Sequence, residues 1–364
     1  MVPKVPTGAE RMRALALQLP HQLRDGFRAG LESVATIPAD ASSVALFGMG
    51  GSAIAGDLAA TLTDPETELS LRVIRSPELP RSLHRGGHAL IASYSGNTWE
   101  TLNAYDEAGR RGIPRVVLTS GGALAERAAE DDVPCVVVPA GGPPRAWVGF
   151  VLGGVLGLLD PAFPESNEDR IGQAVEILEK RIAGYASRRG PPSRWAAQLK
   201  GREPAIYTET GFAGLARRWK TQLEENAKRG ASFDVVPELF HNAVVGWDAI
   251  SAAAAAQHAV VQLEWSEAPA TTAARFGYLA RLLGDRKVTA IRVPLAAPDR
   301  LVALVTGVSL GDFFSLAVAE QAHVDPYPVD AITRMKTSLE RTADRAVPRA
   351  TAPAPRAGAR ASRP

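Results

Sequence analysis

Residues 88–109, HALIASYSGNTWETLNAYDEAG, change character twice within one short stretch. The apolar run at 88–94 is typical of a buried strand, and the segment from residue 99 onward has helical spacing. Between them, SYSGNT (93–98) places hydroxyl groups, a glycine and an asparagine at the end of the strand. An ordinary turn needs only one or two such residues. This strand–loop–helix unit therefore predicts both the fold class and a candidate ligand site.

The same order of strand, loop and helix recurs along the chain. Strands are predicted at 43–48, 69–75, 88–94, 115–120, 133–139, 204–209, 258–265 and 287–295. Short apolar strands alternating with helices are typical of parallel sheets covered on both faces. A chain of 364 residues is long for one core. We therefore expect two doubly wound, three-layer α/β/α domains, at residues 1–165 and 166–345.

Three further segments complete the prediction. The spacing predicts an opening helix at 9–34 and a helical stretch at 167–200. RRGPPS (188–193) should interrupt the latter, because Pro191 and Pro192 cannot continue a helix. A C-terminal helix precedes residues 346–364, whose Ala/Pro/Arg composition predicts disorder.

The composition favours a cytoplasmic enzyme or binding protein. The formal charge is +2, and four arginines lie in the last 19 residues without any acid, so the remainder carries −2. A near-neutral body gives no reason to expect a nucleic-acid partner. No signal peptide is expected, and the apolar stretch 146–159 is too short to span a membrane, so it predicts a buried helix. The single cysteine, Cys135, is expected in a buried strand.

A second loop, GMGGSAIAG (48–56), follows the first predicted strand. Its glycines let the backbone approach a ligand, and Ser52 is placed to cap the next helix, whose amino end favours an anion. Both loops should emerge at the carboxyl edge of one sheet and form a phosphate cradle.

The glycine loop leaves an alternative open. It also fits G-x-G-x-x-A, the dinucleotide pattern. That pattern expects an acid after the second strand, where this chain has Arg75 and Ser76, and an arginine suits the 2′-phosphate of NADP. The hydroxyl residues of SYSGNT also admit a simpler explanation as turn formers.

Taken together, GMGGS and SYSGNTWETL resemble the sugar isomerase (SIS) domain, an α/β unit that binds phosphosugars. The resemblance implies that the phosphate is bound by Gly50, Gly51, Ser52, Ser93, Ser95 and Thr98.

The second half contains RRWKTQLEENAKRG (217–230) and PELFHNAVVGW (237–247). In the first of these, Trp219, Leu223 and Ala227 form an apolar helical face. Lys220, Glu224 and Lys228 form a neighbouring face of i,i+4 charge pairs. A solvated helix accounts for these pairs, but not for the adjacent Glu225 or for the pair His241-Asn242.

These segments, with PPRAWVGF (143–150) and VDAITRMKTSLE (329–340), resemble the bifunctional phosphoglucose/phosphomannose isomerases, which contain two SIS domains. The resemblance implies that Glu225 is the catalytic base and that Arg145 joins the phosphate site. It implies that Lys336 assists ring opening or steadies oxyanion charge. It also implies that His241 carries the ring-opening proton and comes from the neighbouring subunit of a homodimer.

The implied reaction interconverts fructose 6-phosphate with glucose 6-phosphate, mannose 6-phosphate or both, through an enediol and without metal or cofactor. Two departures from the family pattern stand out: Glu224 replaces an asparagine, and Ala243 replaces a glutamate. Ala243 keeps a second hypothesis open, a non-catalytic phosphosugar-binding protein that acts as a regulator or sensor. The preferred epimer is also open, with Tyr327 as a candidate determinant.

Overall fold

The computed structural model describes residues 7–34, 37–83 and 86–346. The chain forms two units, divided after Tyr327. The first unit contains both sheets, and the second contains α14 (Asp330–Ala346). The tail that the sequence predicts to be disordered lies outside the described residues from residue 347 onward.

The first sheet is parallel throughout and has the order β2-β1-β3-β4-β5. Its strands are β1 (Ser43–Phe47), β2 (Ser70–Ile74), β3 (His88–Ser93), β4 (Arg115–Thr119) and β5 (Cys135–Val137). Each agrees with a predicted strand. Cys135 is only half-buried, because β5 is an edge strand.

The second sheet repeats this topology with the order β7-β6-β8-β9. Its parallel strands are β6 (Glu203–Glu209), β7 (Ser232–Val236), β8 (His258–Trp265) and β9 (Thr289–Leu295). The prediction missed β7, an edge strand that is mostly half-buried and contains Asp234. In both sheets the first strand lies between the second and the third, which confirms two doubly wound α/β regions.

The predicted helical segments are present apart from the opening one, and two short helices between residues 243 and 255 were not predicted. In the first half they are α1 (Gly8–Leu17), α2 (Leu19–Leu31), α3 (Gly50–Glu66), α4 (Trp99–Arg110), α5 (Gly122–Glu130) and α6 (Val148–Leu159). In the second half they are α7 (Glu168–Ala186), α8 (Pro191–Leu199), α9 (Ala213–Asn226), α10 (Ala243–Asp248), α11 (Ala252–Ala255), α12 (Ala270–Asp285) and α13 (Arg300–Gln321).

The opening helix is divided, which corrects the prediction of one helix over 9–34. It breaks at Gln18, and Pro20 lies in the first turn of α2, where a proline is tolerated. The interruption at 188–193 is confirmed, since Pro191 begins α8 rather than continuing α7.

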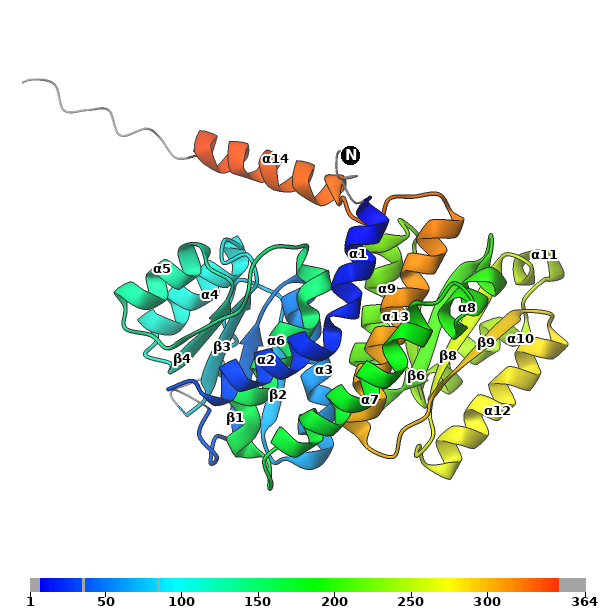
Figure 1. The fold of residues 1–364 in the computed structure, drawn as a ribbon, viewed down its shortest axis with the longest axis horizontal. Coiled ribbons are helices and arrows are strands. Elements are labelled where there is room, and N and C mark those ends of the chain that lie inside the picture. The colour runs from blue at the N-terminus through cyan, green and yellow to red at the C-terminus, as the bar shows by residue number, and fades with distance from the viewer. Residues whose placement is uncertain (1–6, 35–36, 84–85, 347–364) are drawn as a thin grey trace, which may run out of the picture. The chain divides into compact units, whose positions relative to one another are not determined.

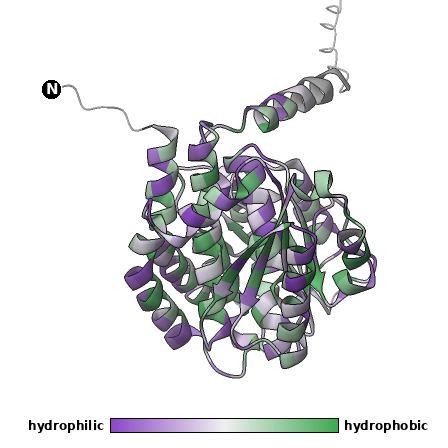
Figure 2. Cartoon of the chain, turned by 90° about the vertical axis from the view of Figure 1, so that its right-hand side faces the viewer, coloured by the Kyte–Doolittle hydropathy of each residue, from purple (hydrophilic) through white to green (hydrophobic). Residues whose placement is uncertain are grey.

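The two sheets share one hydrophobic core, and Figure 1 shows α3 and α13 lying between them. Leu46 and Leu90 of the first sheet and Ile206 and Val261 of the second belong to this core, together with α2, α3, α6, α9 and α13. Each sheet has a separate outer core, beneath α4 and α5 for the first sheet and beneath α10 and α12 for the second. Figure 2 shows hydrophobic strands inside and hydrophilic residues along the outer helices.

Two helices among the described residues are apolar and long enough to span a membrane by composition alone. In the first, Pro144–Ala162, which contains α6, 89% of the most apolar 18-residue window is buried, and in the second, α13, that share is 100%. Both lie inside the protein, so we assign them as core helices. The prediction of a buried helix at 146–159 is confirmed.

One polar contact fixes α9 against α13. Asp312 lies in the middle of the otherwise apolar α13 and is 6% exposed. Its carboxylate accepts two hydrogen bonds from Nη2 of Arg218, at 2.7 and 2.9 Å, and one from Nε2 of Gln222 at 2.6 Å. Burial raises the pKa of Asp312, and the charge of Arg218 opposes that rise.

We predict that Asp312→Ala lowers the free energy of unfolding by about 3–5 kcal/mol, because it leaves a buried guanidinium without its counter-charge. Asp248→Ala is the matched control, since Asp248 forms an exposed ion pair with Arg286. Its cost should stay below about 1 kcal/mol. Urea unfolding of both variants measures the difference, and equal costs would contradict the prediction.

Candidate active site

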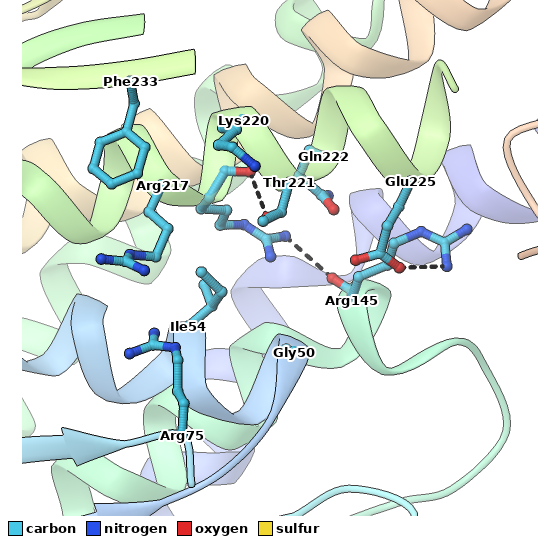
Figure 3. A pocket seen from close by; sticks show the side chains of 12 residues that line it. Gly50, Ile54, Arg75, Arg145, Arg217, Lys220, Thr221, Gln222, Glu225 and Phe233 are labelled. Carbon is cyan, nitrogen blue, oxygen red and sulfur yellow. Dashed lines mark hydrogen bonds and ion pairs between the residues drawn. The ribbon is translucent and has the colours of Figure 1, made fainter. Parts of the chain in front are cut away.

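A basic cavity of about 200 Å³ lies where α3, α9 and the segment before α6 meet. Figure 3 shows Arg217, Lys220 and Glu225 reaching it from α9, with Arg145 and Arg75 approaching from the first half of the chain. The described lining consists of Gly50, Gly51, Ile54, Arg75, Arg145, Arg217, Arg218, Lys220, Thr221, Gln222, Glu225 and Phe233. Among these residues Glu225 is the only acid.

The cations of this cavity are held by carboxylates around it. Asp57 pairs with Arg75 and, at 3.2 Å, with Nε of Arg217. Lys220 pairs with Glu224 at 2.6 Å, one helical turn away. The positive side chains are thereby oriented before any ligand arrives, which suits a phosphate-bearing substrate.

Glu225 is placed as a proton acceptor. Its side chain is 27% exposed, and Oε2 lies 3.4 Å from Nη1 of Arg145. Burial raises the pKa of Glu225, while the nearby charge of Arg145 lowers it. A carboxylate whose pKa lies above its ordinary value is a better base near neutral pH.

Arg145 lies against Glu225 rather than among the hydroxyl groups of SYSGNT. It is 3% exposed, and Nε donates a hydrogen bond of 2.8 Å to Oδ1 of Asn226. Nη2 donates to the carbonyl oxygens of Pro326 and Tyr327, at 2.6 and 3.0 Å. These contacts fix the guanidinium beside the carboxylate.

The glycine loop brings the start of α3 to this site. A Cβ at Gly51 would lie 3.2 Å from the backbone of Pro144, so a side chain there would press on the segment that holds Arg145. The prediction that Ser52 caps α3 is wrong. Met49 is the N-cap, and Oγ of Ser52 instead accepts a 3.1 Å hydrogen bond from the backbone N–H of Tyr94.

That hydrogen bond joins the glycine loop to SYSGNT. Within SYSGNT, Oγ1 of Thr98 lies 3.3 Å from Oγ of Ser93 and 3.4 Å from Oγ of Ser95. Gly96 has φ +66°, and a Cβ there would lie 1.7 Å from the carbonyl oxygen of Gly121. Only glycine fits this position, so the hydroxyl cluster depends on it.

The structure brings some predicted site residues together and leaves others apart. Gly50, Gly51, Arg145 and Glu225 line the cavity, and Ser52 links it to the hydroxyl cluster. The remaining two catalytic candidates lie outside the described lining. His241 is exposed at the end of a short 3-10 helix (Glu238–His241), and Lys336 lies on α14 in the second unit.

Ala243 begins α10 and packs against the outer core of the second sheet. Its backbone N–H donates to Oδ1 of Asn242, whose Nδ2 donates to Glu238 at 3.1 Å. The segment after His241 is thus ordered without a glutamate at position 243.

Sequence reasoning missed the roles of Arg75, Arg217 and Asp312. From the sequence, Arg75 was considered only as a contact for the 2′-phosphate of NADP, and Arg217 only as part of the motif at 217–230. The sequence could have identified Asp312, because it is the only acid between Arg300 and Ala319. A lone acid in a long apolar helix needs a buried partner.

The fold and the site together define an SIS-type α/β protein of the phosphosugar class. Solved structures of the same fold include the C-terminal domain of glucosamine-fructose-6-phosphate aminotransferase from Francisella tularensis, with TM-score 0.66, 15% identity and coverage of 86% of this chain and 96% of that one. Glucosamine-6-phosphate deaminase from Thermotoga maritima gives TM-score 0.64 at 15% identity, with coverage of 87% and 96%. At these identities the likeness establishes the fold alone.

Sequence comparison then gives the family. Residues 188–339 match the bacterial phospho-glucose isomerase C-terminal SIS domain. The bifunctional phosphoglucose/phosphomannose isomerase of Aquifex aeolicus is 33% identical, over 81% of this chain and 90% of that protein. The one of Caldicellulosiruptor bescii is 30% identical, over 90% and 98%. This chain belongs to the bifunctional phosphoglucose/phosphomannose isomerase family.

We predict that Gly96→Ala weakens the binding of inorganic phosphate at least about tenfold, because a hydrogen bond to a charged group contributes about 1.5–3 kcal/mol and the loop must move. Equilibrium dialysis measures the affinity. Gly284→Ala is the control, since a Cβ at Gly284 in α12 meets nothing within 4 Å. Unchanged phosphate affinity in folded Gly96→Ala protein would refute the assignment of this loop.

Proposed function

We propose that this protein is an aldose–ketose isomerase that interconverts fructose 6-phosphate with glucose 6-phosphate, mannose 6-phosphate or both. The observation that carries the proposal is a single carboxylate, Glu225, beside a buried arginine in a cavity whose other charged lining residues are all cations. Membership of the isomerase family supports the same reaction. A non-catalytic binding protein would have no need of such a base.

The chemistry requires one base and a stabilised oxyanion. Glu225 accepts the proton from C2 of the open-chain aldose, the C2–H electron pair forms the C1–C2 double bond, and the π pair of the C1 carbonyl moves to O1 to give an enediolate. Transfer of the O2 proton to O1 and return of the first proton to C1, as the C2 carbonyl forms, give the ketose. The substrate is rearranged without net oxidation or reduction, so the reaction requires no redox cofactor.

Arg145 is in place to stabilise the enediolate as its oxygen gains charge. It donates four hydrogen bonds, one to Glu225 and three to backbone or side-chain oxygens, which fixes its direction before the reaction. The neighbouring acid, Glu224, is paired with Lys220 and does not form a carboxylate dyad with Glu225. This pairing supports a single base at position 225 despite the acid at position 224.

The phosphate is assigned to the glycine loop and the hydroxyl cluster. Ser93, Ser95 and Thr98 supply O–H donors, and the amino end of α3 supplies free N–H groups. We infer that the first domain, residues 1–165, holds the phosphate and that the second, residues 166–345, supplies the base.

We further propose that the protein acts as a cytoplasmic homodimer. His241 is exposed, and the described lining of the cavity contains no histidine, so a partner subunit is a fitting source of the ring-opening acid. Lys336 is the second expected contributor to ring opening. Tyr327, whose carbonyl oxygen binds Arg145, remains the candidate for epimer preference.

We predict that Glu225→Gln lowers turnover of fructose 6-phosphate by a factor of about 10²–10⁴, the usual contribution of a general base. Glu224→Gln, one residue away and on the same helix, should keep turnover within a few-fold of wild type. A coupled assay that detects glucose 6-phosphate and mannose 6-phosphate separately measures both variants. The binding-protein hypothesis would be favoured if the wild-type protein showed no turnover while sugar phosphate still stabilised it against heat.

We predict that Arg145→Met moves the acid limb of kcat/KM to higher pH. Glu225 works deprotonated, so activity falls as pH drops through its pKa, which burial already holds above 4.5. Removing the positive charge of Arg145 raises that pKa further. The control is Arg292→Met, which removes an exposed arginine paired with Glu264. A limb that stays in place or moves to lower pH would contradict the proposed pairing.

We predict that mixing two inactive variants, Glu225→Gln and His241→Ala, restores activity if the histidine comes from the partner. The mixed dimer then has one intact site, formed by Glu225 of one chain and His241 of the other. Random reassociation should give about a quarter of wild-type activity. Activity that stays at the level of the separate variants would show that both groups act within one chain.

A further inference from the structure

A second cavity, of about 460 Å³, lies at the carboxyl edge of the second sheet. Its wall includes Thr210 and Gly211, the first residues after β6. In the order β7-β6-β8-β9 all strands are parallel, and the strand order reverses between β6 and β8. Ligands of open α/β sheets bind at such a switch point. The cavity therefore occupies the place in the second sheet that the phosphate loops occupy in the first.

Arg300 is the main cation of this cavity. Its guanidinium carbon lies 4.4 Å from the ring centre of Trp265, which ends β8, and 5.4 Å from that of Phe212. Glu209, which ends β6 and is 8% exposed, is an acid near this arginine: burial raises the pKa of Glu209, and the charge of Arg300 opposes that rise. Among the described residues, however, Arg300 forms no ion pair within 4.0 Å. Two aromatic rings thus fix a guanidinium whose N–H donors are unpaired.

The rest of the wall leaves room for an anion. Gly211 has no side chain, and a Cβ there would lie 2.7 Å from Nη1 of Arg300. Thr61 lines the cavity, is 3% exposed, and its hydroxyl has no hydrogen-bond partner. The loop then runs into α9, whose first turn faces the same space through Ala213 and Gly214.

The acids of this wall do not cancel that charge. Asp57 is already shared by Arg75 and Arg217, both of which line the basic cavity described above. Asp64 is exposed at this wall, so solvent screens its charge.

Arg217 connects the two cavities because it lines both of them. It binds Asp57 at 3.2 Å, and its guanidinium carbon lies 5.1 Å from the ring centre of Phe233 in the first cavity. An anion in the second cavity attracts Arg217 and withdraws positive charge from the first.

We propose that the second cavity is an effector site for a phosphate-bearing small molecule, bound by Arg300 and Arg217 and coupled through Arg217 to the substrate cavity. Occupancy of this site weakens the binding of sugar phosphate. The coupling rests on the function proposed above, whereas the binding site itself does not.

Equilibrium dialysis of the full chain with radiolabelled inorganic phosphate tests the binding site. Wild-type protein should bind a second phosphate per chain beyond the one at SYSGNT. Arg300→Met keeps the apolar contact with Trp265 and Phe212 but removes the donors, so the second phosphate should bind at least about tenfold more weakly. Ser95→Ala should weaken only the first, and Arg286→Met, at an exposed ion pair with Asp248, should weaken neither.

The outcomes separate the two proposals. The second site is supported if Arg300→Met loses the phosphate of the second cavity and Ser95→Ala loses the phosphate at SYSGNT. If the wild-type protein binds a single phosphate, and Arg300→Met does not change its affinity, the second site is overturned and the isomerase assignment stays intact. Arg300→Lys, which keeps the charge without the planar fork, should restore part of the affinity.

A kinetic measurement tests the coupling. Pyrophosphate should raise the KM for fructose 6-phosphate about fivefold or more in wild-type protein, which is the lower range of allosteric coupling. Arg300→Met should keep its activity without pyrophosphate and lose the pyrophosphate effect. An equal rise in both proteins would mean simple competition at the substrate cavity and would overturn the coupling.

Discussion

The buried ion pair between Arg218 and Asp312 sets the geometry on which the site depends. It closes the contact between α9 and α13, and Nη2 of Arg218 also donates to the carbonyl oxygen of Arg145 at 3.2 Å. One guanidinium thereby fixes the helix that carries Glu225 and the segment that carries its arginine neighbour. Gln222 and Asn226 extend the same network along α9, the latter through Ser315 of α13.

Asn226 shows how closely this network and the chemistry are joined. Its Oδ1 accepts from Arg145 while its Nδ2 donates to Ser315 of α13. The side chain beside the base is thus held from both directions. Burying a polar side chain is costly unless it finds partners, and those of Asn226 are the residues that orient the guanidinium of Arg145 and join α9 to α13.

The two sheets share a topology and differ in the chemistry of their edges. Glycines and hydroxyl groups follow β1 and β3. Thr210, Gly211 and Phe212 follow β6, and the rings of Phe212 and of Trp265 at the end of β8 contact Arg300. Glycine loops bind an anion through backbone N–H groups and helix ends, and an arginine held on aromatic rings binds it through a planar fork. The repeated fold thus offers two distinct ways to hold the same kind of charge.

Most of the fold follows from the sequence because buried parallel strands are short, apolar and bounded by loop residues. All eight predicted strands are present, and the missed β7 is an edge strand with a charged residue, so it lacks the apolar signal. The site was only partly predictable. Motifs located Glu225 and the two loops that we propose bind phosphate, but the partners of Ser52, Arg75 and Asp312 depend on contacts between distant segments. Local spacing predicted that Ser52 caps α3, but its hydroxyl instead accepts a hydrogen bond from the backbone of Tyr94.

The shared core has a consequence for the origin of the chain. The inner face of each sheet is covered by helices that also pack against the other half, so neither half alone can bury its apolar surface. An ancestral chain with a single such sheet would have needed a second copy of itself for that purpose. Gene duplication and fusion then turn an interface between two molecules into the interior of one, and each edge becomes free to change its ligand.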